Sequence, residues 1–322
     1  MVPRMNTRLH LQRISEIASD VQRGLSTSPK SLPPKLFYDA TGSELFEQIT
    51  RLPEYYPTET ERGILRAHAD EMLIAAGAPS VLMELGAGSA NKTTLLLQAA
   101  LRRHPVVSFY PIDVSASALQ DAQLRLNREL PCVRVSPIEM DYTNGIGGLR
   151  RIRGHKLVLY IGSSIGNFEP MEAALLLSRL RRALSPGDHL LLGTDMRKPE
   201  DVLLPAYDDP AGVTARFNLN LLARINRELA GDFDLEQFAH RVVWNRKESR
   251  IEMHLESLRT QNVIINALDI ELTFERGERI HTENSYKFTS TMLDALWLDS
   301  GFTHQRTWCD DRGWFTVHLL RV

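Results

Sequence analysis

The sequence predicts an α/β protein, with a doubly wound parallel sheet that is interrupted by an inserted α+β domain. Two observations lead to this prediction. Short apolar runs alternate with helical patterns over residues 61–195, which is typical of parallel strands joined by right-handed crossovers. After Asp195 the alternation stops, and residues 241–274 show closely spaced short strands that are typical of an antiparallel sheet.

The alternating region begins with a helix that we expect over residues 61–76. The strands that follow are short and apolar because a parallel strand is covered on both of its faces. We expect strands at 80–85, 106–112, 133–140, 156–161 and 188–193, and helices at 91–103, 115–129 and 171–184. Ser115 has the position and chemistry of a helix N-cap.

The flanking segments complete the predicted plan of two domains. Before the alternating region we expect a helix over 9–23, a coil rich in Ser, Pro and Lys over 26–35, and a helix from about Ser43. After it we expect mostly helix over 199–230, most clearly at 217–229, then the short strands, a helix at 290–300 and a last strand at 314–322. One domain is therefore predicted at 62–196 and 286–322, and the other at 1–61 and 197–285.

Composition and charge exclude several classes of protein. The 322 residues include 38 Lys and Arg against 40 Asp and Glu, so the formal net charge is −2 and no nucleic-acid partner is expected. There are two cysteines, Cys132 and Cys309, which excludes a disulfide framework and a zinc ribbon. No apolar run is long enough for a membrane span, and no signal peptide precedes residue 23. We expect a cytoplasmic monomer without a membrane partner.

A glycine loop follows the first predicted strand and has two competing interpretations. The residues 84–93 read ELGAGSANKT, so a strand runs into Gly-x-Gly and then a helix, an arrangement that brings backbone N–H groups to a ligand. A phosphate-binding P-loop would need glycine at position 91, where Asn91 stands before Lys92. The other interpretation is an S-adenosylmethionine (SAM) loop built on Glu84, Gly86 and Gly88.

Acidic residues at the ends of the next two strands favour the SAM loop. Asp113 ends the second strand, where a ribose-binding acid is expected. Asp141 ends the third strand, with Tyr142 beside it, where an adenine amino group would be met. Either acid could instead cap the turn that follows it. An NAD enzyme fits less well because the loop lacks the third glycine of GxGxxG.

Aromatic residues are unusually dense between residues 36 and 61. Phe37, Tyr38, Phe46, Tyr55 and Tyr56 lie close together, and two prolines punctuate the second half of the segment. Such aromatics pack a core in most proteins, but tyrosines on a proline-rich loop also suit ligand contact.

Several long motifs together resemble one family. They are KSLPPKLFYDATGSELFEQITRLPEYYPTETE, ELGAGSANKT, GSSIGN, the AYDD block and TENSYKF, in that order. The chain resembles the histidine-specific, SAM-dependent methyltransferases of ergothioneine biosynthesis from about Gly24 to the C-terminus. The resemblance implies a Rossmann-like SAM-binding domain with an inserted α+β substrate-binding domain. It also implies that the α-amino nitrogen of L-histidine is methylated three times, giving hercynine.

The resemblance assigns SAM contacts to residues of the first domain. Gly86 and Lys92 correspond to SAM-contacting positions. Asp113, Asp141 and Tyr142 match the ribose and adenine side.

The resemblance also assigns substrate contacts. Tyr38 is similar to a tyrosine near the reacting nitrogen, and Tyr55 to a substrate contact. Asn167 and Tyr207 resemble residues that hold the amino and carboxylate ends, so Tyr38 and Asn167 are the expected catalytic residues.

At the side-chain end, Glu283 and Ser285 resemble the pair that binds the imidazole, and Met253 a wall of the pocket. An anionic acceptor and a hydroxyl would distinguish histidine from apolar amino acids. We expect the active site in the cleft between the two domains.

No metal is expected, because methyl transfer needs none and the ten histidines form no HExxH cluster. His254 and His281 are interpreted as surface or strand residues. Three alternatives stay open: a methyltransferase of the same fold acting on another amino acid such as tryptophan, a P-loop NTPase, and a SAM-binding regulator without catalysis.

Overall fold

The computed structural model describes residues 5–322, and for residues 5–14 it describes the backbone alone. These residues divide into two compact units. The large unit comprises Tyr55–Pro199, Arg246–Arg250 and Ser285–Val322. The small unit comprises the described residues up to Glu54, together with Glu200–Asn245 and Ile251–Asn284. Relative to the predicted domains, residues 55–61, 197–199, 246–250 and 285 belong to the large unit instead of the second domain.

The large unit is built on an eight-stranded sheet with the order β13-β14-β7-β6-β2-β3-β4, in which β5 also pairs with β3. The strands from β4 to β7 are parallel, whereas β14 and β13 are antiparallel to them. Their bounds are β2 (Val81–Leu85), β3 (Val107–Asp113), β4 (Val133–Val135), β5 (Ile138–Glu139), β6 (Lys156–Tyr160), β7 (His189–Asp195), β13 (Thr303–Cys309) and β14 (Phe315–Arg321). The predicted parallel α/β architecture is confirmed.

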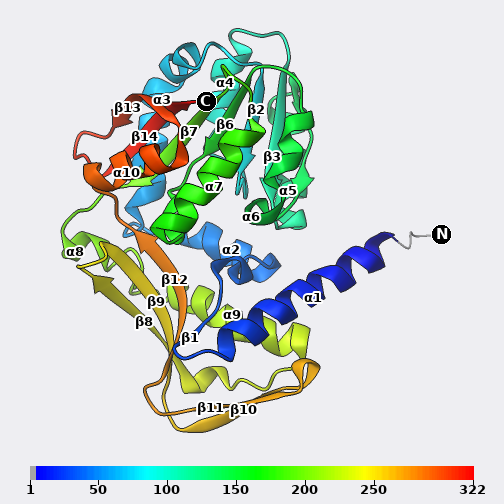
Figure 1. The fold of residues 1–322 in the computed structure, drawn as a ribbon, viewed down its shortest axis with the longest axis vertical. Helices are drawn as coiled ribbons and strands as arrows, with labels where there is room; N and C mark the ends of the chain where they lie inside the picture. Colours follow the sequence, from blue (N-terminus) through cyan, green and yellow to red (C-terminus); the bar gives the residue numbers. More distant parts are fainter. Residues whose placement is uncertain (1–4) are drawn as a thin grey trace. The chain divides into compact units, whose positions relative to one another are not determined.

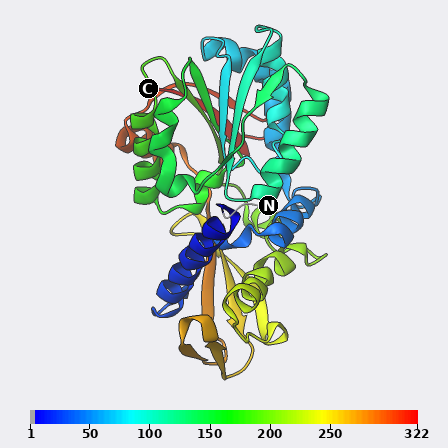
Figure 2. The same cartoon turned by 90° about the vertical axis from the view of Figure 1, so that its right-hand side faces the viewer.

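Helices cover both faces of this sheet (Figures 1 and 2). One face carries α3 (Tyr56–Ala75), α4 (Thr93–Leu101) and α5 (Ala116–Glu129), and the other carries α7 (Pro170–Ala183) and α10 (Ser290–Ser300). Every residue of β2 and β6 is buried, as expected for parallel strands between two helical layers. The short helices of this unit are α6 (Tyr142–Gly145) and the 3₁₀ segments η2 (Ile146–Arg151) and η3 (Ser164–Asn167).

The prediction of one continuous strand over 133–140 is wrong. The structure breaks it into β4 and β5, with Ser136 and Pro137 between them. Proline has no backbone N–H to donate to a neighbouring strand, so the ladder stops there.

Two further differences concern α3 and β13. Helix α3 begins at Tyr56, before the predicted start at 61, because Pro57 occupies its first turn, where proline stabilises a helix. Strand β13 was not predicted, since six of its seven residues are exposed and polar side chains dominate an edge strand.

The small unit combines helices with a four-stranded sheet in the order β1-β12-β9-β8 and a separate β10-β11 hairpin. Its strands are β1 (Lys30–Ser31), β8 (Phe238–Asn245), β9 (Arg250–Ser257), β10 (Gln261–Ile265), β11 (Ile270–Phe274) and β12 (Arg279–Tyr286). Its helices are α1 (Met5–Leu25), α2 (Ala40–Ile49), α8 (Glu200–Leu203) and α9 (Val213–Leu229), with 3₁₀ segments η1 (Pro34–Phe37), η4 (Leu235–Gln237) and η5 (Asn266–Leu268).

Two strands of this sheet correct the sequence-based plan. The TENSYKF motif was not expected in a strand, yet most of it lies in β12. The predicted coil contains β1, in which Lys30 and Ser31 pair in parallel with Ile280 and His281 of β12. A strand of two residues is too short for hydrophobic periodicity to detect, and its partner is about 250 residues away in the chain.

The segment around Tyr38 is held by packing and by a helix cap. Phe37 stacks on Phe217 of α9 with ring centroids 4.4 Å apart. Asp39 caps α2 by accepting a hydrogen bond from the Gly42 N–H at 2.7 Å. Gly42 lies against the Phe37 backbone so closely that a Cβ would overlap the Phe37 carbonyl oxygen, so only glycine fits. The direction of the chain at Tyr38 is therefore well defined.

Candidate functional site

The glycine loop at the end of β2 leaves space at the carboxyl edge of the sheet. Gly86 and Gly88 adopt φ angles of +67° and +49°, which favour glycine. The N–H groups of Gly86 and Ala87 donate to the Ile112 carbonyl at 2.8 and 3.1 Å, which ties the loop to β3. A Cβ at Gly88 would meet nothing within 4 Å, so a ligand can approach the backbone there.

Asp113, the last residue of β3, connects this loop to the next helix. Its carboxylate accepts hydrogen bonds from the Gly88 N–H at 2.8 Å and from the Ser115 N–H at 2.9 Å. Burial raises the pKa of Asp113, although these backbone hydrogen bonds oppose the rise. The acid therefore orders the glycine loop and starts the following turn, where Ser115 caps α5 as predicted. Its proposed contact with ribose is an additional role that these bonds leave open.

Asp141 and Tyr142 lie beside the same loop. Asp141 caps the short helix α6 by accepting from the Thr143 N–H at 2.9 Å. The Tyr142 ring is the nearest neighbour that a Cβ on Gly86 would meet, at 3.7 Å, so Tyr142 borders the glycine loop. Its hydroxyl lies 3.3 Å from that of Tyr160, and burial raises the pKa of Tyr142 to about 12, so the phenol stays protonated.

Lys92 contacts a buried acid instead of facing solvent. Its ammonium donates to the carboxylate of Glu61, which is completely buried in α3. The same carboxylate accepts a hydrogen bond at 3.0 Å from the N–H of Gly162, the first residue of GSSIGN. Glu61 thus links the glycine loop to the loop that carries Asn167, while a contact of Lys92 with SAM stays a prediction.

Asn167 and Ser285 lie on chain segments that contact each other. Gly166 packs so close to Tyr286 that a Cβ would lie 3.0 Å from the Tyr286 carbonyl oxygen. The large unit therefore brings the end of η3 next to the end of β12, and with it one residue predicted for the amino end and one for the imidazole.

A second contact holds these segments together. The Tyr286 hydroxyl donates to Glu169 at 2.6 Å, and Arg250 donates to both the other oxygen of Glu169, at 2.6 Å, and the Tyr286 hydroxyl, at 2.7 Å. Glu169 is also the N-cap of α7. The N-cap of α7, two residues after Asn167, is thereby fixed to the residue that follows Ser285.

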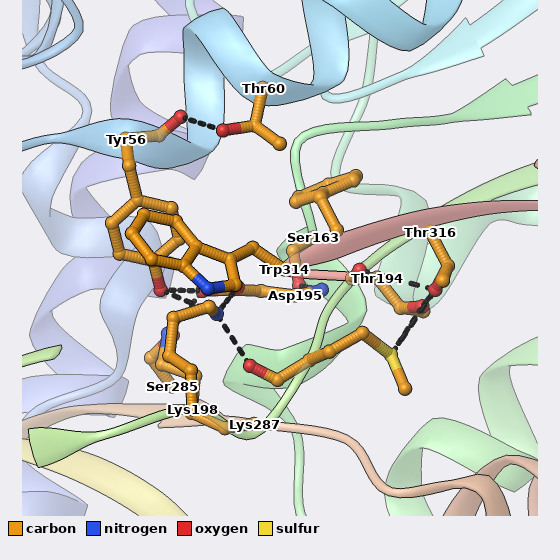
Figure 3. A network of polar contacts seen from close by, with 12 residues as sticks. Tyr56, Thr60, Ser163, Thr194, Asp195, Lys198, Ser285, Lys287, Trp314 and Thr316 are labelled. Atoms are coloured by element: carbon orange, nitrogen blue, oxygen red, sulfur yellow. Dashed lines mark hydrogen bonds and ion pairs between the residues drawn. The ribbon is translucent and has the colours of Figure 1, made fainter. Parts of the chain in front are cut away.

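Ser285 contacts a buried charged cluster, which we define as Tyr56, Asp195, Lys198 and Lys287 (Figure 3). Asp195 accepts from the Tyr56 hydroxyl at 2.6 Å, from Lys287 at 2.9 Å, and from Lys198. Lys198 also donates to the Tyr56 hydroxyl at 2.9 Å, and Lys287 donates to the Ser285 hydroxyl oxygen at 2.8 Å. Three segments distant in sequence are joined by these bonds.

The ionisation states of the cluster follow from its partners. Burial alone would raise the pKa of Asp195, but the charges of Lys287 and Lys198 outweigh burial and lower it. Burial lowers the pKa of Lys198 to about 8, although Asp195 opposes this shift. At neutral pH Asp195 is therefore a carboxylate, and Lys198 is mostly protonated.

The other predicted site residues lie in the small unit. The Tyr38 ring packs edge-on against Phe46 and Phe217, with centroids 5.8 and 5.9 Å away. Tyr207 is buried, and its carbonyl oxygen lies 2.9 Å from Nε2 of His240. Met253 on β9 is also buried, and its carbonyl accepts a hydrogen bond from Thr282 at 3.0 Å. Glu283, on β12, is half-buried.

Tyr55 belongs to the large unit, where it precedes α3 at the N-cap position. Its hydroxyl gives no capping hydrogen bond, and its side chain is half-buried. The adjacent Tyr56 is buried in the charged cluster, so the two tyrosines of the LPEYYPT motif have different surroundings.

Three further observations bear on the sequence-based expectations. Within residues 15–322, whose side chains the structure describes, His, Cys, Asp and Glu form no group that could hold a metal ion. His254 and His281 lie on β9 and β12 as strand residues, and His281 pairs with the Asn284 side chain at 2.8 Å. In the same described range, no helix has both the length and the apolar character that a membrane span requires.

Comparison with known proteins identifies the family. Residues 17–322 match the family described as "Histidine-specific methyltransferase, SAM-dependent". This chain belongs to that family. It is 46% identical over 300 residues to the histidine N-alpha-methyltransferase of Mycolicibacterium smegmatis, and 45% identical to the protein of the same name from Mycobacterium tuberculosis. Each of these alignments covers 93% of both chains.

A more distant relative is the ergothioneine biosynthesis protein 1 of Neurospora crassa. It is 30% identical over 91% of this chain, which spans about a third of that longer protein (33%).

The carboxyl edge of the large unit fits the SAM of this methyltransferase family. The backbone at Gly88 is open, and the Asp113 carboxylate and the Tyr142 ring border the same loop. A nucleoside with a charged amino-acid tail needs such a combination of open backbone, acid and aromatic ring. The described residues thus support the SAM loop and leave the P-loop interpretation without its glycine at position 91.

Sequence reasoning missed several residues of this methyltransferase's candidate site: Tyr56, Glu61, Asp195, Lys198 and Lys287. A signal for Asp195 was present, because it ends a predicted strand just as Asp113 and Asp141 do. Lys287 lies within TENSYKF. Neither position could be paired with its partners, since those partners are distant in the sequence.

Proposed function

We propose that this protein transfers methyl groups from SAM to the α-amino nitrogen of L-histidine three times, giving hercynine, the first step of ergothioneine biosynthesis. The observation that supports this most strongly is the family match over residues 17–322. The names of the two mycobacterial relatives support the α-nitrogen as the acceptor.

The chemistry places specific demands on the substrate site. SAM, when bound, supplies a methyl group attached to a positively charged sulfur. The acceptor amine must be neutral, because an ammonium has no lone pair to attack with, and it must be held in line with the breaking bond. The site therefore has to bind the amine, orient its lone pair and allow its proton to leave.

We assign SAM binding to the carboxyl edge of the large unit. Gly86 and Lys92 line the loop after β2, Asp113 binds the ribose, and Asp141 and Tyr142 face the adenine. The open backbone at Gly88 and the Asp113 bond to its N–H support this assignment.

At the amine, Tyr38 and Asn167 are the proposed catalytic residues. Their hydroxyl and amide groups orient the nitrogen lone pair after each methyl is added. Tyr55 and Tyr207 complete the contacts with the backbone of the amino acid. The packing of the Tyr38 ring, and the close packing of Gly166 next to Asn167, support these roles.

At the side chain, Glu283 accepts a hydrogen bond from the imidazole, Ser285 binds the other ring nitrogen, and Met253 forms a wall. Glu283 and Ser285 stand two residues apart near the end of β12, and side chains at that spacing share one face of a strand.

The experiment is a competition among all twenty amino acids with excess SAM, followed by mass spectrometry of the products. L-Histidine should gain three methyl groups at the α-nitrogen, which raises its mass by three CH₂ units. Methylation of the ring, a halt after one methyl, or preference for tryptophan would overturn the proposal.

Glu283→Ala tests the assignment of the side-chain end. Losing a charged acceptor should weaken histidine binding by roughly 1.5–3 kcal/mol, or about 10- to 150-fold. Combined with Met253→Val, it should raise kcat/KM for tryptophan relative to histidine. Glu271→Ala, which removes an exposed carboxylate from β11, is the matched control. Equal losses on both substrates would mean that Glu283 supports the fold and does not recognise the side chain.

A further inference from the structure

His240, on β8, lies between two groups that determine which of its ring nitrogens carries the proton. Nδ1 lies 2.8 Å from the side-chain nitrogen of Asn218, and Nε2 lies 2.9 Å from the carbonyl oxygen of Tyr207. Asn218, in α9, is completely buried. Its amide nitrogen also donates to the carbonyl oxygen of His254, the residue after Met253, at 3.0 Å. A chain of three hydrogen bonds therefore runs from β9 through α9 and β8 to the backbone of Tyr207.

The partners fix the direction of each bond in this chain. The His254 carbonyl can only accept, so Asn218 turns its NH₂ group, and not its oxygen, toward it. The other hydrogen of that NH₂ group points to Nδ1 of His240, which accepts it with a lone pair. Because the Tyr207 carbonyl also can only accept, Nε2 carries the hydrogen. His240 is therefore assigned as the neutral ring protonated at Nε2.

Burial favours the same neutral form of the ring. It lowers the pKa of His240, although the Tyr207 carbonyl and Asp208 oppose the shift, so the ring is neutral at neutral pH. The arrangement has a cost, because Oδ1 of Asn218 is buried and has no hydrogen-bond partner among the described residues. Packing alone thus does not account for an asparagine at this position, whereas its bonds to His240 and His254 do.

The last bond of the chain acts on the backbone of Tyr207. The N–H of Tyr207 donates to the Leu204 carbonyl at 3.0 Å, in the turn that follows α8. Its carbonyl accepts from His240, so both polar backbone groups of Tyr207 are bonded. The direction in which the buried Tyr207 side chain leaves the backbone depends on these two bonds.

We propose that His240 is a positioning residue for the carboxylate end of the substrate: held by Asn218 with its proton on Nε2, it fixes the backbone that carries the Tyr207 hydroxyl. This inference rests on the proposed function, in which Tyr207 contacts the backbone of the amino acid. It adds the residue through which the protein selects a free carboxylate.

The test compares two ligands that differ at the carboxylate end. L-Histidinol keeps the amine and the imidazole of L-histidine but has a hydroxymethyl group in place of the carboxylate. Calorimetry on protein saturated with S-adenosylhomocysteine gives the Kd of each ligand without methyl transfer. Wild type should bind L-histidine at least about 10-fold more tightly than L-histidinol, the effect of one hydrogen bond to a charged group.

Two substitutions of His240 separate its two bonds. A glutamine side chain places an N–H near the position of Nε2, so His240→Gln should keep the preference for L-histidine within about 2-fold of wild type. An asparagine side chain reaches only the position of Nδ1 and leaves the Tyr207 carbonyl without its donor. His240→Asn should therefore lower the preference about 3- to 10-fold, with little change in the Kd of L-histidinol.

A double variant shows whether His240 acts through Tyr207. Tyr207→Phe removes the hydroxyl and should lower the preference at least as much as His240→Asn does. His240→Asn added to Tyr207→Phe should lower it no further, because both changes act on the same contact.

Asn218→Leu and Asn226→Leu form a matched pair on α9. Each removes an amide that makes two hydrogen bonds, but Asn226 is bonded to the backbone of Phe233 and not to His240. Asn218→Leu should lower the preference about 3-fold or more, because the His240 ring is free to turn. Asn226→Leu should leave it unchanged.

Four results would overturn the inference: equal affinity of wild type for the two ligands, an unchanged preference in His240→Asn, equal weakening of both ligands in that variant, or the same selective loss in Asn226→Leu. If His240→Asn does not fold, His240→Phe, which fills the ring's volume without nitrogen atoms, takes its place with the same expected loss. Failure of wild type to methylate L-histidine in the competition experiment would instead refute the proposed function.

Discussion

Two buried acids of the same sheet differ in their ionisation. Glu84 lies in β2 and Asp195 at the end of β7, with β6 between these strands, and the two acids are 3% and 1% exposed. Burial raises the pKa of Glu84 to about 8, whereas two lysines lower the pKa of Asp195 despite its burial. Equal burial therefore produces a neutral acid in one strand and an anion in the other.

The partners explain this difference. Glu84 receives a hydrogen bond from the Thr93 hydroxyl at 2.6 Å, and no cation is bonded to it among the interactions of the described residues. Asp195 is bonded to Lys198 and Lys287. A hydrogen bond from a hydroxyl offsets part of the desolvation cost of a buried carboxylate, but two adjacent positive charges offset more of it. The position of an acid in the sheet thus does not reveal its charge.

The largest expected effect comes from Asp195→Asn. The variant leaves two buried lysines without their anion, which should lower the free energy of unfolding by about 3–5 kcal/mol. Urea denaturation at neutral pH measures the change as a lower midpoint. The matched isostere Glu84→Gln should not destabilise the protein at pH 7, because Glu84 is already largely neutral there. Similar losses in both variants would contradict the comparison.

A third acid, Asp113, accepts hydrogen bonds from backbone N–H groups. In our proposal it also binds SAM. Asp113→Ala should weaken SAM binding by about 1.5–3 kcal/mol, since a hydrogen bond to a charged acceptor is lost. Histidine binding to SAM-saturated protein should change little. Calorimetric titration with SAM measures this loss, and Asp121→Ala, which changes an exposed residue of α5, is the control. An unaltered SAM affinity would mean that Asp113 only holds the backbone of the glycine loop and the following turn.

For Glu84 the expected effect is a slope of about 1 kcal/mol per pH unit, which is small at any single step in pH. The folded state holds the Glu84 proton up to a pKa of about 8, whereas the reference carboxyl releases it near 4.5. Its contribution to stability is therefore complete below 4.5, declines as the pH rises, and is lost above 8. Glu84→Gln should flatten this decline between pH 5 and 8. Parallel pH profiles for the variant and wild type would show that Glu84 is ionised throughout.

Most of the candidate site in the large unit could be proposed from sequence because its residues lie at strand ends. Gly86, Asp113 and Asp141 each follow an apolar run, and parallel strands place their carboxyl ends at one edge. The family motifs supplied Asn167 and Ser285, and the structure shows that their segments are in contact.

The sequence by itself determined the parallel sheet, the glycine loop, the family and the residue types at the site, because these depend on local periodicity and on contiguous motifs. Only the tertiary structure decided which charges meet. Tyr56, Asp195 and Lys287 belong to three distant segments, and their hydrogen bonds depend on how β7, α3 and the end of β12 pack. Ionisation depends on those contacts through desolvation and neighbouring charge, so the same carboxyl group is neutral at Glu84 and anionic at Asp195.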